Sequence, residues 1–295
     1  MTKSLAIIGG GRVGRALGRS LKGAGWKIVI VASRTDATAK KALRFIKAGR
    51  AITGLPVTLT GAETILLTVP DDAIAMLAGE LAQRVGAELE NKIVLHTSGA
   101  LDETVLKPLR ECGAAIGSMH PMQTFTGVNV PPLAGKVFAI GGDELATRMA
   151  RRIARALGGV PLTIDAQKKS LYHAAGAFGA GLVLALEESG AQLLMESGLK
   201  RREAQRALLS LTRQVLDHYE KLGAQKAWTG PLSRGDYSVV AAHLKALRGV
   251  APEFLAAYVA ASRLAARVLS RNPEGMLSEL DRISESSHVA KAKGD

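Results

Sequence analysis

The segment SLAIIGGGRVGRALG, residues 4–18, decides the fold of this chain. Its apolar run, residues 5–8, is typical of a buried strand, and three consecutive glycines end that run. Val13, Leu17 and Leu21 then recur at intervals of four, which predicts that a helix follows the glycines. The segment is therefore a strand, a glycine turn and a helix, and it fits the pattern G-x-G-x-x-G at Gly9, Gly11 and Gly14.

Each glycine of this pattern has a physical role. Gly9 permits the tight turn, Gly11 lets the backbone approach a pyrophosphate, and Gly14 lets the helix pack close to the strand. The helix N-terminus adds free N–H groups and a partial positive charge, which favour bound phosphates. The pattern predicts a dinucleotide site, against the alternative of a glycine-rich turn in an unrelated α/β protein. The residues expected to bind the dinucleotide here are Gly9, Gly11, Arg12, Val13 and Gly14.

The end of the second predicted strand, residues 27–32, decides which dinucleotide is preferred. An acidic residue there hydrogen-bonds the ribose 2′-OH of NAD, whereas an arginine accommodates the 2′-phosphate of NADP. This chain has Ser33, Arg34 and Thr35, and Asp36 stands one residue too far along. A guanidinium can fork onto a phosphate, and hydroxyls can add hydrogen bonds. We therefore expect NADP(H) rather than NAD(H); in the alternative, Arg34 is solvated and Asp36 turns inward.

Alternating strands and helices continue to about residue 165. Apolar runs predict further strands at residues 54–59, 63–70, 92–96, 114–119, 137–141 and 160–164, with helices at 35–50, 102–112 and 144–157. This alternation predicts the α/β class, with a doubly wound parallel sheet. Ligands bind at the carboxyl ends of parallel strands, so the turn after residue 68 should lie beside the dinucleotide. We therefore expect Val69 and Pro70 to contact it, and we interpret Asp71 and Asp72 as helix caps.

Beyond residue 165 the strand patterns largely stop. Helical spacing covers residues 168–199, 201–222, 239–247 and 253–270. The first of these segments tolerates Gly176, Gly179, Gly181 and Gly190, which indicates close helix packing or a bend. We therefore predict two domains, a dinucleotide-binding Rossmann domain at residues 1–164 and an all-helical domain for substrate or dimerisation at residues 165–295.

The charge of the chain is concentrated near the glycine pattern. The net charge is +13, and residues 1–50 hold 12 Lys or Arg against one acidic residue. Such a positive field favours a polyanionic cofactor. Aromatic residues make up only 4% of the chain, so platforms for stacking bases are scarce and no nucleic-acid partner is expected.

Targeting and cysteine signals restrict the class further. The chain shows no charged-then-apolar leader and no apolar run of ~18 residues, which predicts a cytoplasmic, soluble protein without a membrane partner. The single cysteine, Cys112, excludes an intramolecular disulfide and a cysteine-based metal cluster, and no metal site is expected.

Three places carry residues suited to chemistry. His96 and His120 end two strands at the sheet edge that also holds the glycine turn, and a hydroxyl or amide follows each of them. Lys169 and His173 are four residues apart and share a helix face, and either could supply the proton that matches a transferred hydride. The loop at 229–237 carries an arginine and an aspartate that either bind substrate or pair with each other.

We assign these residues as follows. The expected catalytic residues are Lys169, His173, His120 and Ser98, with one of the first two as the proton donor, and the expected substrate-binding residues are His96, Gln123, Arg234 and Asp236. For each histidine the alternative is a structural cap, and for the helix start it is a solvated surface with one buried histidine.

Six motifs spread over the chain carry a resemblance. They are GGGRVGRAL at 9–17, VPDDAI at 69–74, HTSGAL at 96–101, HPMQTF at 120–125, KSLYHAA at 169–175 and TGPLSRGD at 229–236. With these motifs the chain resembles Rossmann-like proteins that carry a DUF2520 C-terminal domain, within the β-hydroxyacid dehydrogenase and pyrroline-5-carboxylate reductase-like group. The resemblance implies NADP-dependent oxidoreductase chemistry and a helical domain, similar to that of 6-phosphogluconate dehydrogenase, that forms a homodimer.

The chain departs from this group at one helix. Related hydroxyacid dehydrogenases carry a lysine and, four residues on, an asparagine, where this chain has Lys169 and His173. An asparagine common later in the helix is also missing, since residues 178–181 read FGAG. We expect an oxidoreductase that transfers a hydride between NADP(H) and a small carbonyl, imine or hydroxy acid. The alternatives are a non-catalytic NADP(H)-binding sensor or partner protein and a deazaflavin-linked NADP reductase.

Overall fold

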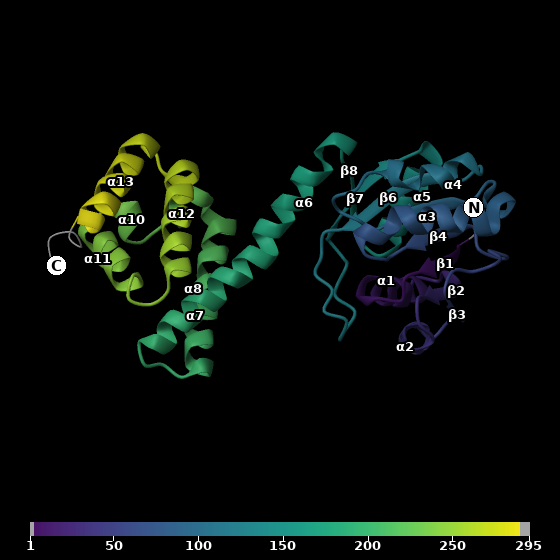
Figure 1. The fold of residues 1–295 in the computed structure, drawn as a ribbon, viewed down its shortest axis with the longest axis horizontal. Helices are drawn as coiled ribbons and strands as arrows, with labels where there is room; N and C mark the ends of the chain where they lie inside the picture. The colour runs from purple at the N-terminus through teal and green to yellow at the C-terminus, as the bar shows by residue number, and fades with distance from the viewer. Residues whose placement is uncertain (1–2, 290–295) are drawn as a thin grey trace. The chain divides into compact units, whose positions relative to one another are not determined.

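Eight strands form one sheet in the order β3-β2-β1-β4-β5-β6-β7-β8 (Figure 1). The computed structural model describes residues 3–289 and divides the chain into two compact units, residues 1–181 and 182–295. All neighbouring strands are parallel except β6 and β7. The strands are β1 Ser4–Ile8, β2 Lys27–Ser33, β3 Arg50–Thr53, β4 Thr64–Leu67, β5 Ile93–His96, β6 Ala115–Pro121, β7 Val137–Gly142 and β8 Val160–Thr163.

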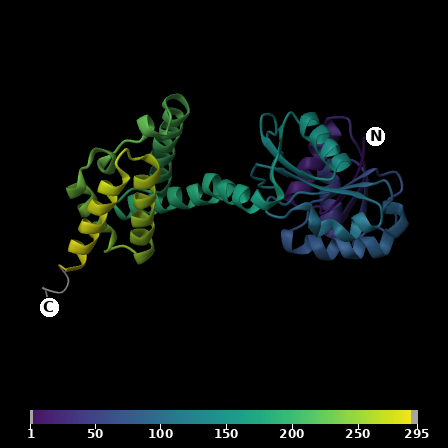
Figure 2. The same cartoon turned by 90° about the horizontal axis from the view of Figure 1, so that it is seen from above.

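Helices cover both faces of this sheet (Figure 2). Leu17 of α1, Ile46 of α2 and Met149 of α5 belong to the core on one face. Ile74 of α3 and Leu109 of α4 belong to a separate core on the other. The predicted α/β class with a doubly wound sheet is therefore confirmed. The helices are α1 Arg12–Gly23, α2 Asp36–Ile46, α3 Asp71–Val85, α4 Lys107–Glu111 and α5 Glu144–Ala156, and a 3₁₀ turn, Glu103–Leu106, precedes α4.

Two details of the predicted sheet were wrong. The third strand is β3 at Arg50–Thr53 and not residues 54–59. Gly54 has a φ of +76°, and Pro56 has no N–H to give a neighbouring strand, so the chain leaves the sheet there. The sheet is also not wholly parallel, because β7 runs antiparallel to β6. The connection between them, residues 122–136, contains no helix, and a parallel pair needs such a crossover.

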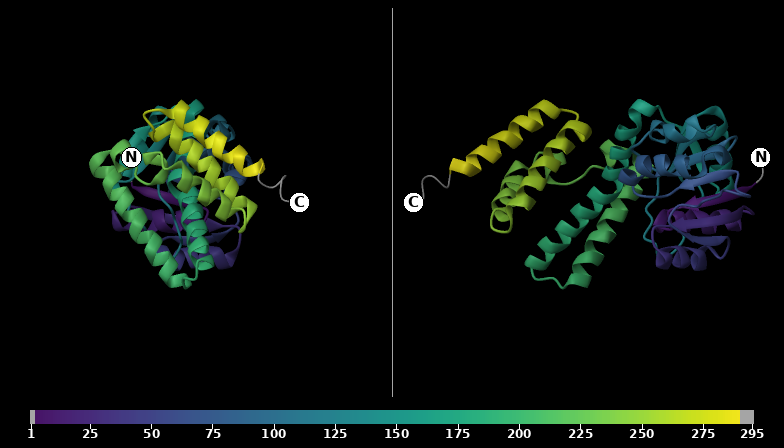
Figure 3. Two further views of the ribbon diagram at one scale, coloured as in Figure 1. Left: turned by 90° about the vertical axis from the view of Figure 1, so that its left-hand side faces the viewer. Right: turned by 45° about the vertical axis from the view of Figure 1, so that its right-hand side comes forward.

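The second unit is helical throughout its described residues, 182–289. The adjacent helices α7 and α8 lie side by side (Figure 3). A small core of Val240, Leu244, Ala266 and Leu280 joins α11, α12 and α13. The helices are α7 Val183–Glu196, α8 Arg201–Leu222, α9 Ala224–Ala227, α10 Pro231–Arg234, α11 Tyr237–Leu247, α12 Pro252–Leu269 and α13 Pro273–Val289.

One helical segment follows β8 and enters the second unit. The helix predicted over residues 168–199 is α6, Lys169–Ala177, and α7, joined by a π-helical turn at Phe178–Leu182. The domain boundary predicted after residue 164 lies just past β8, whereas the two compact units divide inside the π-helical turn. Helix α6, which carries Lys169 and His173, therefore belongs to the same unit as the sheet. No helix within residues 3–289 is both long enough and apolar enough to cross a bilayer.

Candidate functional site

Two of the three glycines of the G-x-G-x-x-G pattern are required by close packing. Gly9 has a φ of +113°, and a Cβ built on it would lie 2.5 Å from the carbonyl oxygen of Thr68. A Cβ on Gly14 would lie 2.1 Å from the Gly9 carbonyl oxygen and 2.4 Å from Thr68 Oγ1. Thr68 Oγ1 also donates a 2.6 Å hydrogen bond to that Gly9 oxygen. No side chain fits at either position, and Thr68 ties the turn to the end of β4.

Gly11 differs from them because it faces open space. A Cβ on Gly11 would have no heavy atom within 4 Å. Gly11 is the N-cap of α1, no side chain caps this helix, and its first turn holds no acidic residue. The N–H groups of Arg12 and Val13 find no acceptor among the residues that the structure describes. The start of α1 thus presents free donors and positive dipole charge to an open space that fits a phosphate.

The residues after β2 divide into structural and free groups. Ser33 Oγ accepts a 2.8 Å hydrogen bond from Gly10 N–H, and Thr35 caps α2 by accepting from Thr38 N–H. Asp36 is exposed and forms a 2.8 Å ion pair with Lys40, so it does not turn inward. Arg34 is exposed and has no hydrogen bond or ion pair within residues 3–289. Arg34 is therefore the group after β2 that remains free for a ligand.

The turn between β4 and α3 connects the glycine turn to the next strand end. Val69 packs against the core under α3, and Pro70 is the N-cap of that helix. Asp71, the first residue of α3, is half-buried, and its Oδ2 accepts a 2.7 Å hydrogen bond from Ser98 Oγ. Residues 68–71 thus connect the glycine turn with the residues that follow β5.

His96 and Ser98 hold the turn that follows β5. His96 is fully buried, its Nδ1 accepts from Ser98 N–H at 3.2 Å, and its Nε2 donates to the Asp102 carbonyl at 2.9 Å. Burial, with a smaller contribution from the charge of Lys169, lowers the pKa of His96 to about 4. Ser98 Oγ accepts hydrogen bonds from the N–H groups of Ala100 and Leu101. Both side chains are fully engaged within the protein, which makes them positioning groups for the turn.

Lys169 reaches the sheet from the start of α6. Its side chain is 2% exposed, and Nζ donates a 2.7 Å hydrogen bond to Ser118 Oγ on β6. Burial lowers the pKa of Lys169 to about 8, although the nearby carboxylates of Glu103, Asp102 and Asp71 favour its charged form. Lys169 is thus a buried amine whose protonation changes close to neutral pH.

His120 is held between two residues of α6. Its Nδ1 lies 3.0 Å from the Tyr172 hydroxyl, and its ring is edge-on to the His173 ring with centroids 5.6 Å apart. Burial, followed by the charges of His173 and Lys169, lowers the pKa of His120 to about 4. Burial raises the pKa of Tyr172 to about 12, so its hydroxyl keeps its proton at neutral pH and shares a hydrogen bond with Nδ1.

Gly99 makes room for this histidine pair. A Cβ on Gly99 would lie 2.9 Å from His120 Nε2 and 2.9 Å from His173 Cδ2. His173 itself is exposed. The two histidine edges and the backbone after β5 therefore meet at Gly99, where a larger residue would displace one of the rings.

The remaining predicted substrate residues are engaged with other groups of the protein. Gln123 Nε2 donates to the Pro132 carbonyl at 3.1 Å, which closes the loop between β6 and β7. Arg234 and Asp236 belong to the second unit and form an exposed ion pair at 2.8 Å. The structure thus shows the pairing that was one of the two alternatives for this loop.

Four residues at the site were not among the sequence-predicted ones: Asp71, Gly99, Ser118 and Tyr172. Ser118 stands two residues before His120 on one strand, so both side chains point to the same face of the sheet. Tyr172 stands three residues after Lys169 on one helix, which places the two on neighbouring positions of its surface. These spacings could have indicated both residues. Nothing in the sequence signals that Asp71 bonds Ser98.

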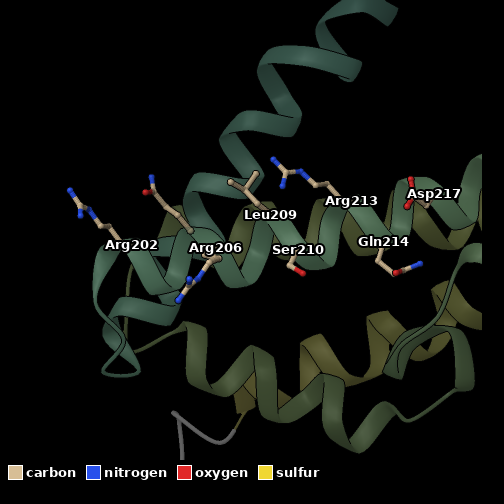
Figure 4. A pocket seen from close by; sticks show the side chains of 8 residues that line it. Arg202, Arg206, Leu209, Ser210, Arg213, Gln214 and Asp217 are labelled. Atoms are coloured by element: carbon tan, nitrogen blue, oxygen red, sulfur yellow. The ribbon is translucent and has the colours of Figure 1, made fainter.

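Two hollows lie on separate parts of the surface. One, of about 450 Å³, includes Asp165, Lys168 and Tyr172 in its lining and so adjoins the histidine pair. The other, of about 560 Å³, runs along α8 in the second unit, where Figure 4 shows Arg202, Arg206 and Arg213 projecting from the helix. The hollow on α8 contains none of the sequence-predicted site residues.

Comparison with known proteins identifies two domains. Residues 2–121 match the family model of a Rossmann-like domain, and residues 136–265 match DUF2520, a domain of unknown function. A search of curated proteins found no match.

Solved structures share the fold over most of the chain. A Bacteroides fragilis protein provisionally described as an NADP oxidoreductase has 22% identity and a TM-score of 0.74, covering 89% of this chain and 97% of that one. A Thermotoga maritima protein has 24% identity and a TM-score of 0.73, covering 90% and 98%. The Aspergillus terreus reductive aminase, solved with NADPH and ethyl-5-oxohexanoate, has 19% identity and a TM-score of 0.67, covering 90% and 94%.

Proposed function

Since this chain joins a Rossmann-like domain to a DUF2520 domain, we propose that it is an NADP(H)-dependent oxidoreductase acting on a small carbonyl, imine or hydroxy acid. One observation carries the proposal. Successive contacts connect the open start of α1 with the titratable groups at the same sheet edge, running from Gly9 through Thr68 and Asp71 to Ser98. A dinucleotide site and a proton donor are the two parts that hydride transfer needs.

The glycine turn and the end of β2 fit NADP(H). The N–H groups of Arg12 and Val13 and the open space at Gly11 would take the pyrophosphate, and Arg34 would take the 2′-phosphate. Val69 and Pro70 would then border the nicotinamide, which supplies the hydride when NADPH is bound. The reductive aminase with the same fold was solved with NADPH, and this supports the assignment.

Lys169 fits the part of proton donor. Its pKa of about 8, which burial lowers, places the ammonium form in the majority at neutral pH and still ready to give up its proton. Ser118 Oγ, which is fully buried, accepts from Nζ and would hold the ammonium group in place. His120, with its pKa near 4, is neutral and would orient the substrate heteroatom through Nε2.

Arg34→Ala is expected to lower the affinity for NADPH by about tenfold to a hundredfold and to leave the affinity for NADH within about twofold, because a charge-assisted bond to the 2′-phosphate is lost. Calorimetric titration of the purified protein with each coenzyme measures both values. Arg44→Ala is the matched control, since Arg44 is another exposed arginine of the basic region. Equal losses for the two variants, or a wild-type preference for NADH, would contradict the role of Arg34.

We further propose that the helical region, residues 165–295, forms a homodimer. Large apolar side chains stand exposed on both members of the α7 and α8 pair, more than an isolated soluble chain usually leaves open. A second copy of this chain would cover them. They are Leu184, Leu186, Leu211, Val215, Leu216, Tyr219 and Leu222.

Sedimentation equilibrium is expected to give twice the chain mass of 30.9 kDa. Leu184→Glu combined with Leu216→Glu should shift the mass toward that of one chain, because two charges would be buried in the interface. Leu145→Glu places the same charge on an exposed leucine of α5 and should keep the dimer. A wild-type protein that sediments as one chain at micromolar concentration rules the dimer out.

A further inference from the structure

The Asp71 side chain has one carboxylate oxygen without a hydrogen bond within residues 3–289. The residue begins α3 beside the turn that would border the nicotinamide. Its Oδ2 is held by Ser98 Oγ at 2.7 Å, while Oδ1 has no partner within residues 3–289. Asp72, the next residue, is exposed on the same helix turn. Ser98 therefore fixes the direction of one carboxylate of this pair.

Three carboxylates act on the buried lysine of the site. Asp71, Asp102 and Glu103 all act on Lys169, which is the cation they surround. The Nζ of Lys169 donates a hydrogen bond to Ser118 Oγ. His96 on β5 and His120 on β6 are neutral at pH 7, since burial lowers the pKa of each to about 4.

Lys169, the lysine on which Asp71 acts, does not offer its charge to a substrate carboxylate. Lys169 is buried and bonded to Ser118, and Arg234, the sequence-predicted anion binder, pairs with Asp236 in the second unit. A hydroxy acid or keto acid bound beside Asp71 would place its negative charge next to this half-buried carboxylate, which costs free energy.

We propose that Asp71 selects a positively charged substrate, the protonated imine or iminium ion of a small amine, over neutral carbonyl compounds and hydroxy acids. This rests on the proposed function and names the substrate class of the same site. Asp71 accepts the iminium N–H, or pairs with the charge of an N-alkylated iminium, through the oxygen that Ser98 leaves free.

The chemistry of an iminium suits this arrangement. The carbon gains a C–H bond from the hydride that NADPH supplies, the C=N π electrons become the nitrogen lone pair, and NADP⁺ and an amine result. Part of the positive charge is still on the substrate in the transition state of this step, so Asp71 stabilises the bound substrate and the transition state to a similar degree. Its effect should therefore fall on KM rather than on kcat.

Steady-state NADPH oxidation with four probes tests the proposal: N-methylpyrrolinium, pyrroline, cyclopentanone and pyruvate. N-methylpyrrolinium is a permanent cation, and cyclopentanone is a neutral ring of the same size. We expect the two nitrogen compounds to have the highest kcat/KM. Asp71→Asn should raise KM for N-methylpyrrolinium about tenfold with kcat within about twofold, because one ion pair is lost.

Asp71→Asn keeps an oxygen that accepts from Ser98, so the fold around it is retained. Asp72→Asn is the matched control, since it removes the same charge from the same helix turn and should leave KM unchanged. Binding without turnover gives a second readout. With NADP⁺ present, the unreactive N,N-dimethylpyrrolidinium should bind the wild-type protein about tenfold more tightly than Asp71→Asn by calorimetry.

The outcomes separate this inference from the function it rests on. Preferred reduction of pyruvate or cyclopentanone overturns the inference and leaves the oxidoreductase standing. Binding of the quaternary cation that Asp71→Asn does not weaken overturns it as well. If NADPH binds and none of the probes is reduced, the proposed reductase fails, while cation binding that depends on Asp71 still supports the selectivity of the site.

Discussion

Gly14→Ala is expected to destabilise the protein by about 3 kcal/mol or more and to abolish NADPH binding, because the added Cβ meets backbone. That Cβ would lie 2.1 Å from the Gly9 carbonyl oxygen and 2.4 Å from Thr68 Oγ1. Both atoms are held in place, because Thr68 Oγ1 donates a hydrogen bond to the Gly9 carbonyl oxygen. Either α1 moves away from β1 or the turn opens. Chemical denaturation gives the free energy of unfolding, and calorimetry gives the affinity for NADPH.

Two glycines at the ends of α1, Gly11 and Gly23, distinguish an effect on helix packing from an effect on NADPH binding. Gly11→Ala adds a methyl group to open space, so it should cost less than about 1 kcal/mol of stability yet lower NADPH affinity at least about tenfold, by filling the place of the pyrophosphate. Gly23→Ala, at the other end of the helix, also meets nothing within 4 Å and should change neither quantity. Normal NADPH binding by Gly11→Ala would falsify the placement of the dinucleotide at this turn.

Lys169→Met is expected to lower kcat for the reduction of pyrroline by about a hundredfold to ten-thousandfold, the range associated with a lost general acid. Affinity for NADPH should change by less than about threefold, since Lys169 contacts Ser118 and not the glycine turn. The methionine keeps an apolar stem in a position that is 2% exposed, which limits the cavity left behind. Turnover at the wild-type rate would remove Lys169 from the mechanism.

The pH dependence identifies the donor. A general acid works only while protonated, and burial lowers the pKa of Lys169 to about 8, so kcat for pyrroline should fall as the pH rises through 8. Lys169→Met should lack this alkaline fall. Ser118→Ala should move it to lower pH, because the ammonium form loses an acceptor. N-methylpyrrolinium needs no proton and should show neither the fall nor the loss in Lys169→Met.

Many of the helices and strands could be predicted from local patterns. The strand, glycine turn and helix of residues 4–21 are β1, the turn and α1, and the predicted helix at 201–222 is α8. Both predictions depend only on local sequence signals, which are the periodicity of apolar side chains and the steric freedom of glycine. The third strand was misplaced because Gly54 and Pro56 end it, and the antiparallel β7 was missed because strand direction depends on the connection and not on the strand.

The sequence by itself determined the fold class, the dinucleotide turn and which residue types stand at each strand end, since these follow from local spacing and from steric needs at single positions. Only the tertiary structure decided how those residues are used. Lys169 meets Ser118 and His120 meets Tyr172 across about fifty residues, and burial then sets their pKa values. His96 is buried and forms two hydrogen bonds, one through each ring nitrogen. Ser98 Oγ donates to Oδ2 of Asp71, so that Oδ1 is available to a ligand. Such contacts depend on how strands and α6 pack together, which no local pattern records.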